Sequence, residues 1–118
     1  MEHVFTIDLK NDNDLIAEYV AAHKRVWPEV KEALRATGII EEKIWLLGNR
    51  MFMLVVTDDD FDWDRDTTGY LDLPRTREWD DLMRKLQTPV PEAGRDDWWA
   101  PMEKVFDLNW PDDLADES

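Results

Sequence analysis

The sequence has 118 residues and is 43% hydrophobic, which suits one folded domain because a second core would have too little material. Its formal net charge of −14 repels nucleic acids, anionic membranes and phosphorylated substrates, so none of these is an expected partner. It contains no Cys, no secretory signal and no apolar run long enough to span a bilayer, and we expect a cytoplasmic protein.

The first half of the chain predicts a strand, two helices and a hairpin, in that order. Residues 3–9 alternate in the manner of a half-buried strand. Apolar residues at three- and four-residue spacing then predict a helix over 13–26, and Pro28 begins a second helix over 28–37 that Gly38 ends. Residues 39–47 and 51–57 are strand-like, and Gly48-Asn49 between them is a hairpin signal.

The second half begins with the acidic stretch DDDFDWDRDTTGYL, which predicts a short helix capped by one of its first Asp residues. A calcium loop is excluded there, because Trp63 stands where such a loop requires Gly. Residues 74–87 predict a longer helix, 88–97 a loop, and the region near 100–108 a final strand. We expect one domain over 1–110 and an acidic C-terminal tail over 111–118.

This order of elements predicts an α+β fold of the ferredoxin-like type, in which helices gather on one face of a four-stranded antiparallel sheet. The other face would be uncovered in a monomer, although apolar residues occupy both sides of 51–57. Two sheets facing each other in a homodimer, the dimeric α/β barrel, would cover that surface.

His23 is the candidate for proton transfer, because His3 lies at the edge of the first strand. It follows Tyr19 by four residues, so both side chains project from one helix face. A satisfied core histidine and a functional one both fit this position. One usable His without a second ligand motif excludes a zinc or iron site, and the only Ser is Ser118, so the chemistry left open is proton transfer.

Trp79 and Asp80 place a flat apolar side chain beside a carboxylate. Sugar pockets use this combination to bind a ring face and its hydroxyls. A core Trp followed by a solvated Asp is the alternative interpretation.

These residues also carry a family resemblance. The motif Y-x3-H-x3-WPE spans residues 19–29, and further segments follow in order: Gly38-Ile39, IWL at 44–46, FDWDRD at 61–66, EWDDLM at 78–83 and MEKVF at 102–106. The series resembles the L-rhamnose mutarotase family over nearly the whole chain. FDWDRD and EWDDLM resemble the branch associated with L-fucose.

The resemblance implies a dimeric ferredoxin-like fold without a cofactor that interconverts the α and β anomers of a 6-deoxy sugar. It implies that His23 is the proton donor and that Tyr19 binds substrate. Trp79 and Asp80 take the place of a substrate-contacting Trp-Trp pair, and the second Tyr of rhamnose-type members falls at Glu42. Both departures favour L-fucose over L-rhamnose.

Our prediction is therefore a mutarotase that opens the sugar ring by general acid–base catalysis. His23 and Asp80 are its expected catalytic residues, and Tyr19, Trp79 and Trp45 its substrate-binding residues. Trp45 or Trp99 would replace the lost aromatic surface. The expected partners are a small neutral monosaccharide and a second copy of the chain, with no metal or cofactor. The alternatives are a cofactor-free monooxygenase of the dimeric α/β-barrel class and a non-catalytic sugar-binding or regulatory protein.

Overall fold

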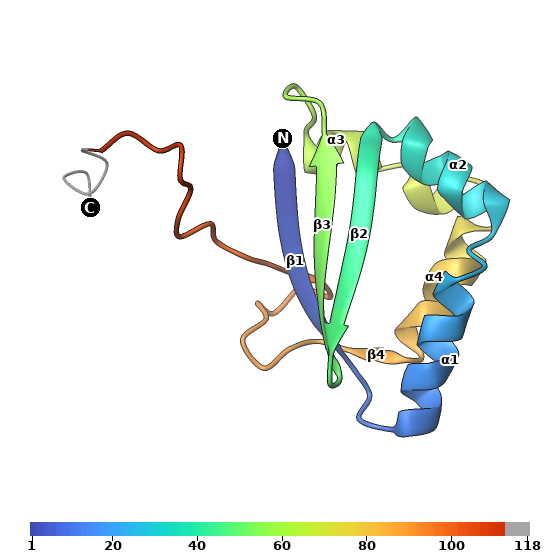
Figure 1. Cartoon of the computed structure of the whole chain (residues 1–118). Coiled ribbons are helices and arrows are strands. Elements are labelled where there is room, and N and C mark those ends of the chain that lie inside the picture. Colours follow the sequence, from blue (N-terminus) through green and yellow to red (C-terminus); the bar gives the residue numbers. More distant parts are fainter. Residues whose placement is uncertain (113–118) are drawn as a thin grey trace.

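A long hairpin forms one side of the sheet in the computed structural model, which describes residues 1–112 (Figure 1). β2 (Ile39–Leu47) and β3 (Arg50–Thr57) are antiparallel and are joined at Gly48-Asn49, as predicted. Gly48 has a φ of +62°, a conformation in the left-handed region that glycine adopts without strain. β1 (Glu2–Leu9) pairs antiparallel with the other edge of β3.

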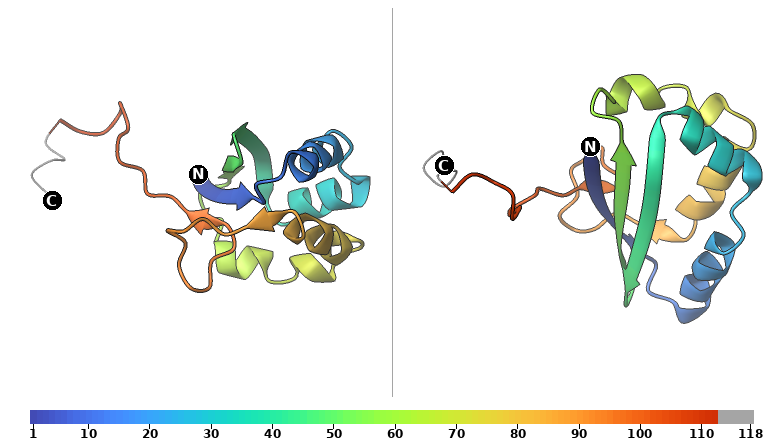
Figure 2. Two further views of the ribbon diagram at one scale, coloured as in Figure 1. Left: turned by 90° about the horizontal axis from the view of Figure 1, so that it is seen from below. Right: turned by 45° about the horizontal axis from the view of Figure 1, so that its top comes forward.

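The fourth position of the sheet is divided between two short strands. β4 (Gln87–Thr88) pairs with Asp8 and Leu9, and β5 (Ala100–Pro101) pairs with Phe5 and Thr6. The predicted strand near 100–108 therefore ends at Pro101, and this part of the prediction is wrong. The Met102 N–H still donates to the Val4 carbonyl, at 2.8 Å. Because β1 begins at Glu2, almost no edge is left beyond that point, and the chain leaves the sheet (Figure 2).

The helices gather on one face of the sheet, which confirms the predicted α+β, ferredoxin-like fold (Figures 1 and 2). They are α1 (Asn13–His23), α2 (Pro28–Ala36), α3 (Trp63–Thr67), the single 3-10 turn η1 (Tyr70–Asp72) and α4 (Thr76–Arg84). α1 and α4 are shorter than predicted. The Asp12 carboxylate accepts the Asp14 and Leu15 N–H groups at the start of α1, and Asp62 caps α3 by accepting the Arg65 N–H.

The main core lies between the sheet and the helices. Ile7 and Leu9 of β1, with Met51 and Val55 of β3, are almost completely buried there. The opposite face of the sheet is apolar but exposed, as predicted for residues 51–57. Its side chains include Val4, Phe52 and Trp45, and the last of these is 53% exposed.

A β-bulge near the start of β2 decides which of its side chains face the helices. Ile39 pairs with Thr57, Glu41 with Val56 and Glu42 with Val55, so Ile40 is an extra residue. Strict alternation from the buried Ile39 would send residues 41, 43 and 45 toward the helices. The bulge turns the strand over, and Glu42 and Ile44 face the helices instead.

Within residues 1–112 the helices are all too short or too polar to cross a membrane. The expected acidic tail, 111–118, lies outside the described residues from position 113 onward.

Candidate active site

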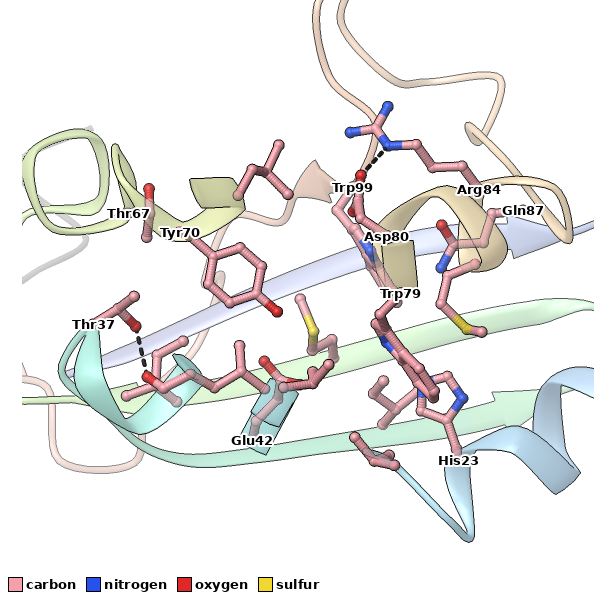
Figure 3. A pocket seen from close by; sticks show the side chains of 18 of the residues that line it. His23, Thr37, Glu42, Thr67, Tyr70, Trp79, Asp80, Arg84, Gln87 and Trp99 are labelled. Atoms are coloured by element: carbon pink, nitrogen blue, oxygen red, sulfur yellow. Dashed lines mark hydrogen bonds and ion pairs between the residues drawn. The ribbon is translucent and has the colours of Figure 1, made fainter. Parts of the chain in front are cut away.

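A cavity of about 390 Å³ lies between the helix-facing side of the sheet and the helices (Figure 3). This volume falls in the usual range for small-molecule sites, about 300–1,000 Å³. Four of the five predicted site residues line it: Tyr19, His23, Trp79 and Asp80. Residues from α1, α4 and the sheet therefore meet around one space, although the predicted members lie up to 61 positions apart in the chain.

His23 is half-buried at the last turn of α1, where its ring stacks on Tyr19 with 4.2 Å between centroids. Its Nδ1 lies 3.0 Å from the Tyr19 carbonyl oxygen. A carbonyl only accepts hydrogen bonds, so Nδ1 carries a proton and Nε2 is the nitrogen with a free lone pair when the ring is neutral. Burial lowers the pKa of His23 below 6.5, and the bond to the Tyr19 carbonyl partly opposes that shift. At neutral pH, Nε2 is thus a proton acceptor.

The Tyr19 hydroxyl is oriented by a chain of hydrogen bonds. Trp98 Nε1 donates to Gln87 Oε1 at 2.8 Å, and Gln87 Nε2 donates to the Tyr19 hydroxyl at 3.2 Å. Because an indole N–H only donates, it fixes which end of the Gln87 amide faces Tyr19. The phenol accepts from Gln87 and keeps its own proton to donate. Burial raises the pKa of Tyr19 to about 12, against the effect of the Gln87 bond, so the phenol stays neutral.

Trp79 on α4 forms the aromatic wall beside His23, with 5.5 Å between the two ring centroids in an edge-to-face arrangement. Trp27 also packs against Trp79, edge to face, with 5.1 Å between the ring centroids. The Arg75 guanidinium covers Trp27, 3.8 Å from the ring centroid, and makes an ion pair with Glu29 at 3.7 Å. The WPE segment thus holds Trp79 in place.

Asp80 also lines the cavity, but its carboxylate is engaged. Asp80 Oδ2 accepts a hydrogen bond from Arg84 Nε at 2.8 Å, one helical turn further along α4 (Figure 3). Arg84 in turn lies over the Trp98 ring, 4.8 Å from its centroid. This ion pair fixes the orientation of the carboxylate at the cavity.

Trp45, the fifth predicted site residue, is not brought into the cavity. It pairs with Phe52, which in turn pairs with Thr6, and directly paired residues share one face of a sheet. That face is the exposed one, so the sheet separates Trp45 from Tyr19 and His23. The bulge in β2 is the physical reason, because it reverses the facing of every later residue in the strand. Trp99, named with Trp45 as a replacement, does line the cavity.

Several polar lining residues were not predicted to act, among them Glu42, Tyr70 and Gln87. Tyr70 follows the acidic stretch in η1, and its phenol faces the cavity (Figure 3). Gln87 is the first residue of β4 and is buried. It ends the helix predicted over 74–87, and no motif or spacing there indicates a functional side chain. Among residues 1–112, no group of three His, Asp or Glu side chains is arranged to hold a metal ion.

Comparisons with known proteins match this chain to sugar mutarotases. The family profile described as L-rhamnose mutarotase matches residues 2–108. A UPF0734 protein of Dictyostelium discoideum is 47% identical, over 88% of this chain and 86% of its own length. A protein of Xanthomonas campestris named L-fucose mutarotase is 32% identical, over 89% of this chain and 86% of its own length.

Among solved structures, the L-rhamnose mutarotase of Formosa agariphila superimposes with a TM-score of 0.65 and 21% identity. The match covers 92% of this chain and 98% of that one, and supports the fold. The family profile spans most of the chain, and a relative above 30% identity covers nearly all of it. The chain therefore belongs to the L-rhamnose mutarotase family.

Proposed function

We propose that this protein is a monosaccharide mutarotase that interconverts the α and β anomers of a 6-deoxy sugar, with L-fucose preferred over L-rhamnose. The observation that carries the proposal is the His23 imidazole at a sugar-sized cavity, with Nε2 free and the Trp79 indole beside it. The choice of L-fucose is supported by the relative that bears that name and by Asp80, a hydroxyl acceptor in the place of a second indole.

Anomer exchange needs a base at the anomeric hydroxyl and an acid at the ring oxygen. A base removes the proton of the anomeric hydroxyl, the C1–O5 bond breaks, and an acid protonates the ring oxygen. The open aldehyde rotates about C1–C2 and closes again with the opposite configuration at C1. The neutral His23 ring supplies the base at Nε2.

The other predicted residues bind and orient the sugar in this proposal. Tyr19 donates its hydroxyl proton to a sugar oxygen, since its acceptor side is already used by Gln87. Trp79 covers a face of the pyranose ring, as indoles do in sugar sites. Asp80, held by Arg84, accepts a hydrogen bond from a sugar hydroxyl.

Saturation-transfer NMR with L-fucose and L-rhamnose tests the activity. Exchange already occurs in water, so the measured quantity is the rate between the α and β anomeric signals with and without protein. We expect catalytic amounts to accelerate exchange, with the larger effect on L-fucose. Line broadening without faster exchange would support the sugar-binding alternative instead. An absence of both effects, together with turnover of a conjugated aromatic substrate, would support a monooxygenase.

We also propose that the chain is a homodimer in the cytoplasm. The exposed apolar face of the sheet and the projecting segment after Pro101 both support a second copy, since Val105, Phe106 and Leu108 are each more than 70% exposed. Large apolar patches on one chain favour an interface between copies.

Replacing Phe52 by Asp puts a charge on the exposed face of the sheet and is expected to halve the mass measured by light scattering. The unsubstituted protein should measure twice the 14.0 kDa of one chain. Val20→Asp on α1 is the matched control, since Val20 is equally exposed but lies on the helix layer. A mass of one chain for the unsubstituted protein would refute the dimer.

A further inference from the structure

Glu42 is the one carboxylate that the β2 bulge directs into the cavity. It pairs with the buried Val55 and lines the cavity with Ile44, whereas its neighbour Glu41 lies on the exposed face. Figure 3 shows the Glu42 side chain directed into the same space as the Tyr70 hydroxyl, while His23 enters from another element. Bulges beside functional sites often redirect one side chain in this way.

The Glu42 carboxylate has no protein partner among residues 1–112, in contrast to the other carboxylates nearby. Glu41 makes an ion pair with Lys43 at 2.7 Å, and Asp80 is bound to Arg84 at 2.8 Å. Glu42 takes part in neither a hydrogen bond nor an ion pair in the described part of the chain. A carboxylate without a cation beside apolar walls does not stabilise a fold, so its place in the cavity calls for another explanation.

The surroundings of Glu42 also alter its chemistry. The residue is open to the cavity, yet protein atoms crowd its carboxyl group, and this desolvation raises the pKa of Glu42. Its charge reaches both phenols: after burial, it is a further cause of the raised pKa of Tyr70, about 12, and of Tyr19. The raised pKa of Glu42 and the lowered pKa of His23 bring the two groups toward the same pH range.

We propose that Glu42 is the second proton-transfer residue of the cavity. It acts at the ring oxygen while His23 acts at the anomeric hydroxyl. The inference rests on the proposed mutarotase function and names the acid that His23 requires. Asp80 is already paired with Arg84 and keeps its proposed role as a hydroxyl acceptor.

The two groups complete the reaction without another reactant, and between them they hold one proton before and after the ring opens. His23 Nε2 takes the proton from the anomeric hydroxyl, and O1 becomes the carbonyl oxygen of the aldehyde. The electron pair of the C1–O5 bond goes to O5, which takes the proton of the Glu42 carboxyl. On closure, O5 attacks C1 and returns its proton to Glu42, while His23 returns its proton to O1. Atoms and charge balance in each direction.

The shared proton predicts a pH profile with two limbs. The pair is active when it holds one proton, so the rate falls at low pH when both groups are protonated and at high pH when neither is. The other titratable or charged groups around the cavity are Tyr19, Tyr70, Asp80 and Arg84. Burial raises the pKa of both phenols to about 12, and Asp80 makes an ion pair with Arg84. The limbs therefore belong to the His23–Glu42 pair.

Glu42→Gln in the full-length protein tests the inference, because the amide keeps the shape but cannot transfer a proton. We expect the anomer exchange rate at saturating sugar to fall by about 10²-fold or more, with sugar affinity within a few fold. The remaining activity should keep one limb, which rises with pH through the lowered pKa of His23. Glu41→Gln is the matched control on the other face of β2, and it should leave both rate and profile unchanged.

The outcomes separate this inference from the function on which it rests. If the unsubstituted protein does not accelerate exchange, the proposed function and the role of Glu42 both fall. If it does, and Glu42→Gln retains its rate at saturation or both pH limbs, only the assignment of Glu42 is overturned. A loss confined to sugar affinity has the same meaning. Circular dichroism of both variants checks that each is folded.

Discussion

Replacing His23 by Gln is expected to reduce the acceleration of anomer exchange by about 10²–10⁴-fold, the usual contribution of a positioned acid–base group. Gln fills a similar volume and donates a hydrogen bond, but it cannot take up a proton. Sugar affinity should change by no more than a few fold, because Tyr19, Trp79 and Asp80 stay in place. Saturation transfer between the α and β signals of L-fucose measures the rate, and a titration of ligand signals measures the affinity.

The second histidine provides the matched control for this change. His3 lies on β1 outside the cavity, where its Nε2 lies 3.1 Å from the Thr57 hydroxyl. His3→Gln should therefore leave the exchange rate unchanged. An unchanged rate in His23→Gln, or an equal loss in both variants, would contradict the role of His23.

Truncating Trp79 to Ala is expected to have the largest effect on sugar binding. The indole is the cavity wall beside His23 and packs against both His23 and Trp27. Its removal deletes the surface proposed to cover the pyranose ring and leaves one side of the imidazole unsupported. We expect the dissociation constant for L-fucose to rise about tenfold or more, equivalent to about 1.4 kcal/mol, together with a lower exchange rate. A saturation-transfer titration provides both values.

Two further variants distinguish the Trp79 wall from a general loss of aromatic surface. Trp79→Phe keeps a flat ring and should recover part of the affinity. Trp45→Ala removes the same side chain from the opposite face of the sheet and should leave affinity unchanged. Wild-type affinity in Trp79→Ala would show that the sugar does not use this wall.

The helical part of the site was predictable because helix geometry is local. The spacing of Tyr19 and His23 requires both side chains to share a face of α1, and the structure stacks their rings. The position of Trp79 on the apolar stripe of its helix is likewise set by sequence spacing. What spacing could not give is the state of each group. The pairing of Asp80 with Arg84, and the orientation of Tyr19 by Gln87, depend on side chains that meet only in the folded chain.

The sheet was harder to predict in detail, since its facing and its edges depend on pairing partners. Periodicity identified the hairpin, yet nothing in the letters of IIEEKIWLL shows that Ile40 is an extra residue. Trp45 lies outside the cavity for that reason. The final strand was predicted too long because its length depends on where β1 begins, which is a property of the partner and not of residues 100–108.

The extra residue Ile40 in β2 also affects how residue roles can be transferred between relatives by alignment. In a chain without it, residues counted to the same distance from the glycine that ends α2 would lie on the opposite face of the strand. If Ile40 were paired as a regular residue, so that the bulge was lost, Lys43 and Trp45 would exchange sides with Glu42 and Ile44. An alignment that omits a gap opposite Ile40 would therefore match cavity-facing residues with residues of the opposite face along the rest of the strand.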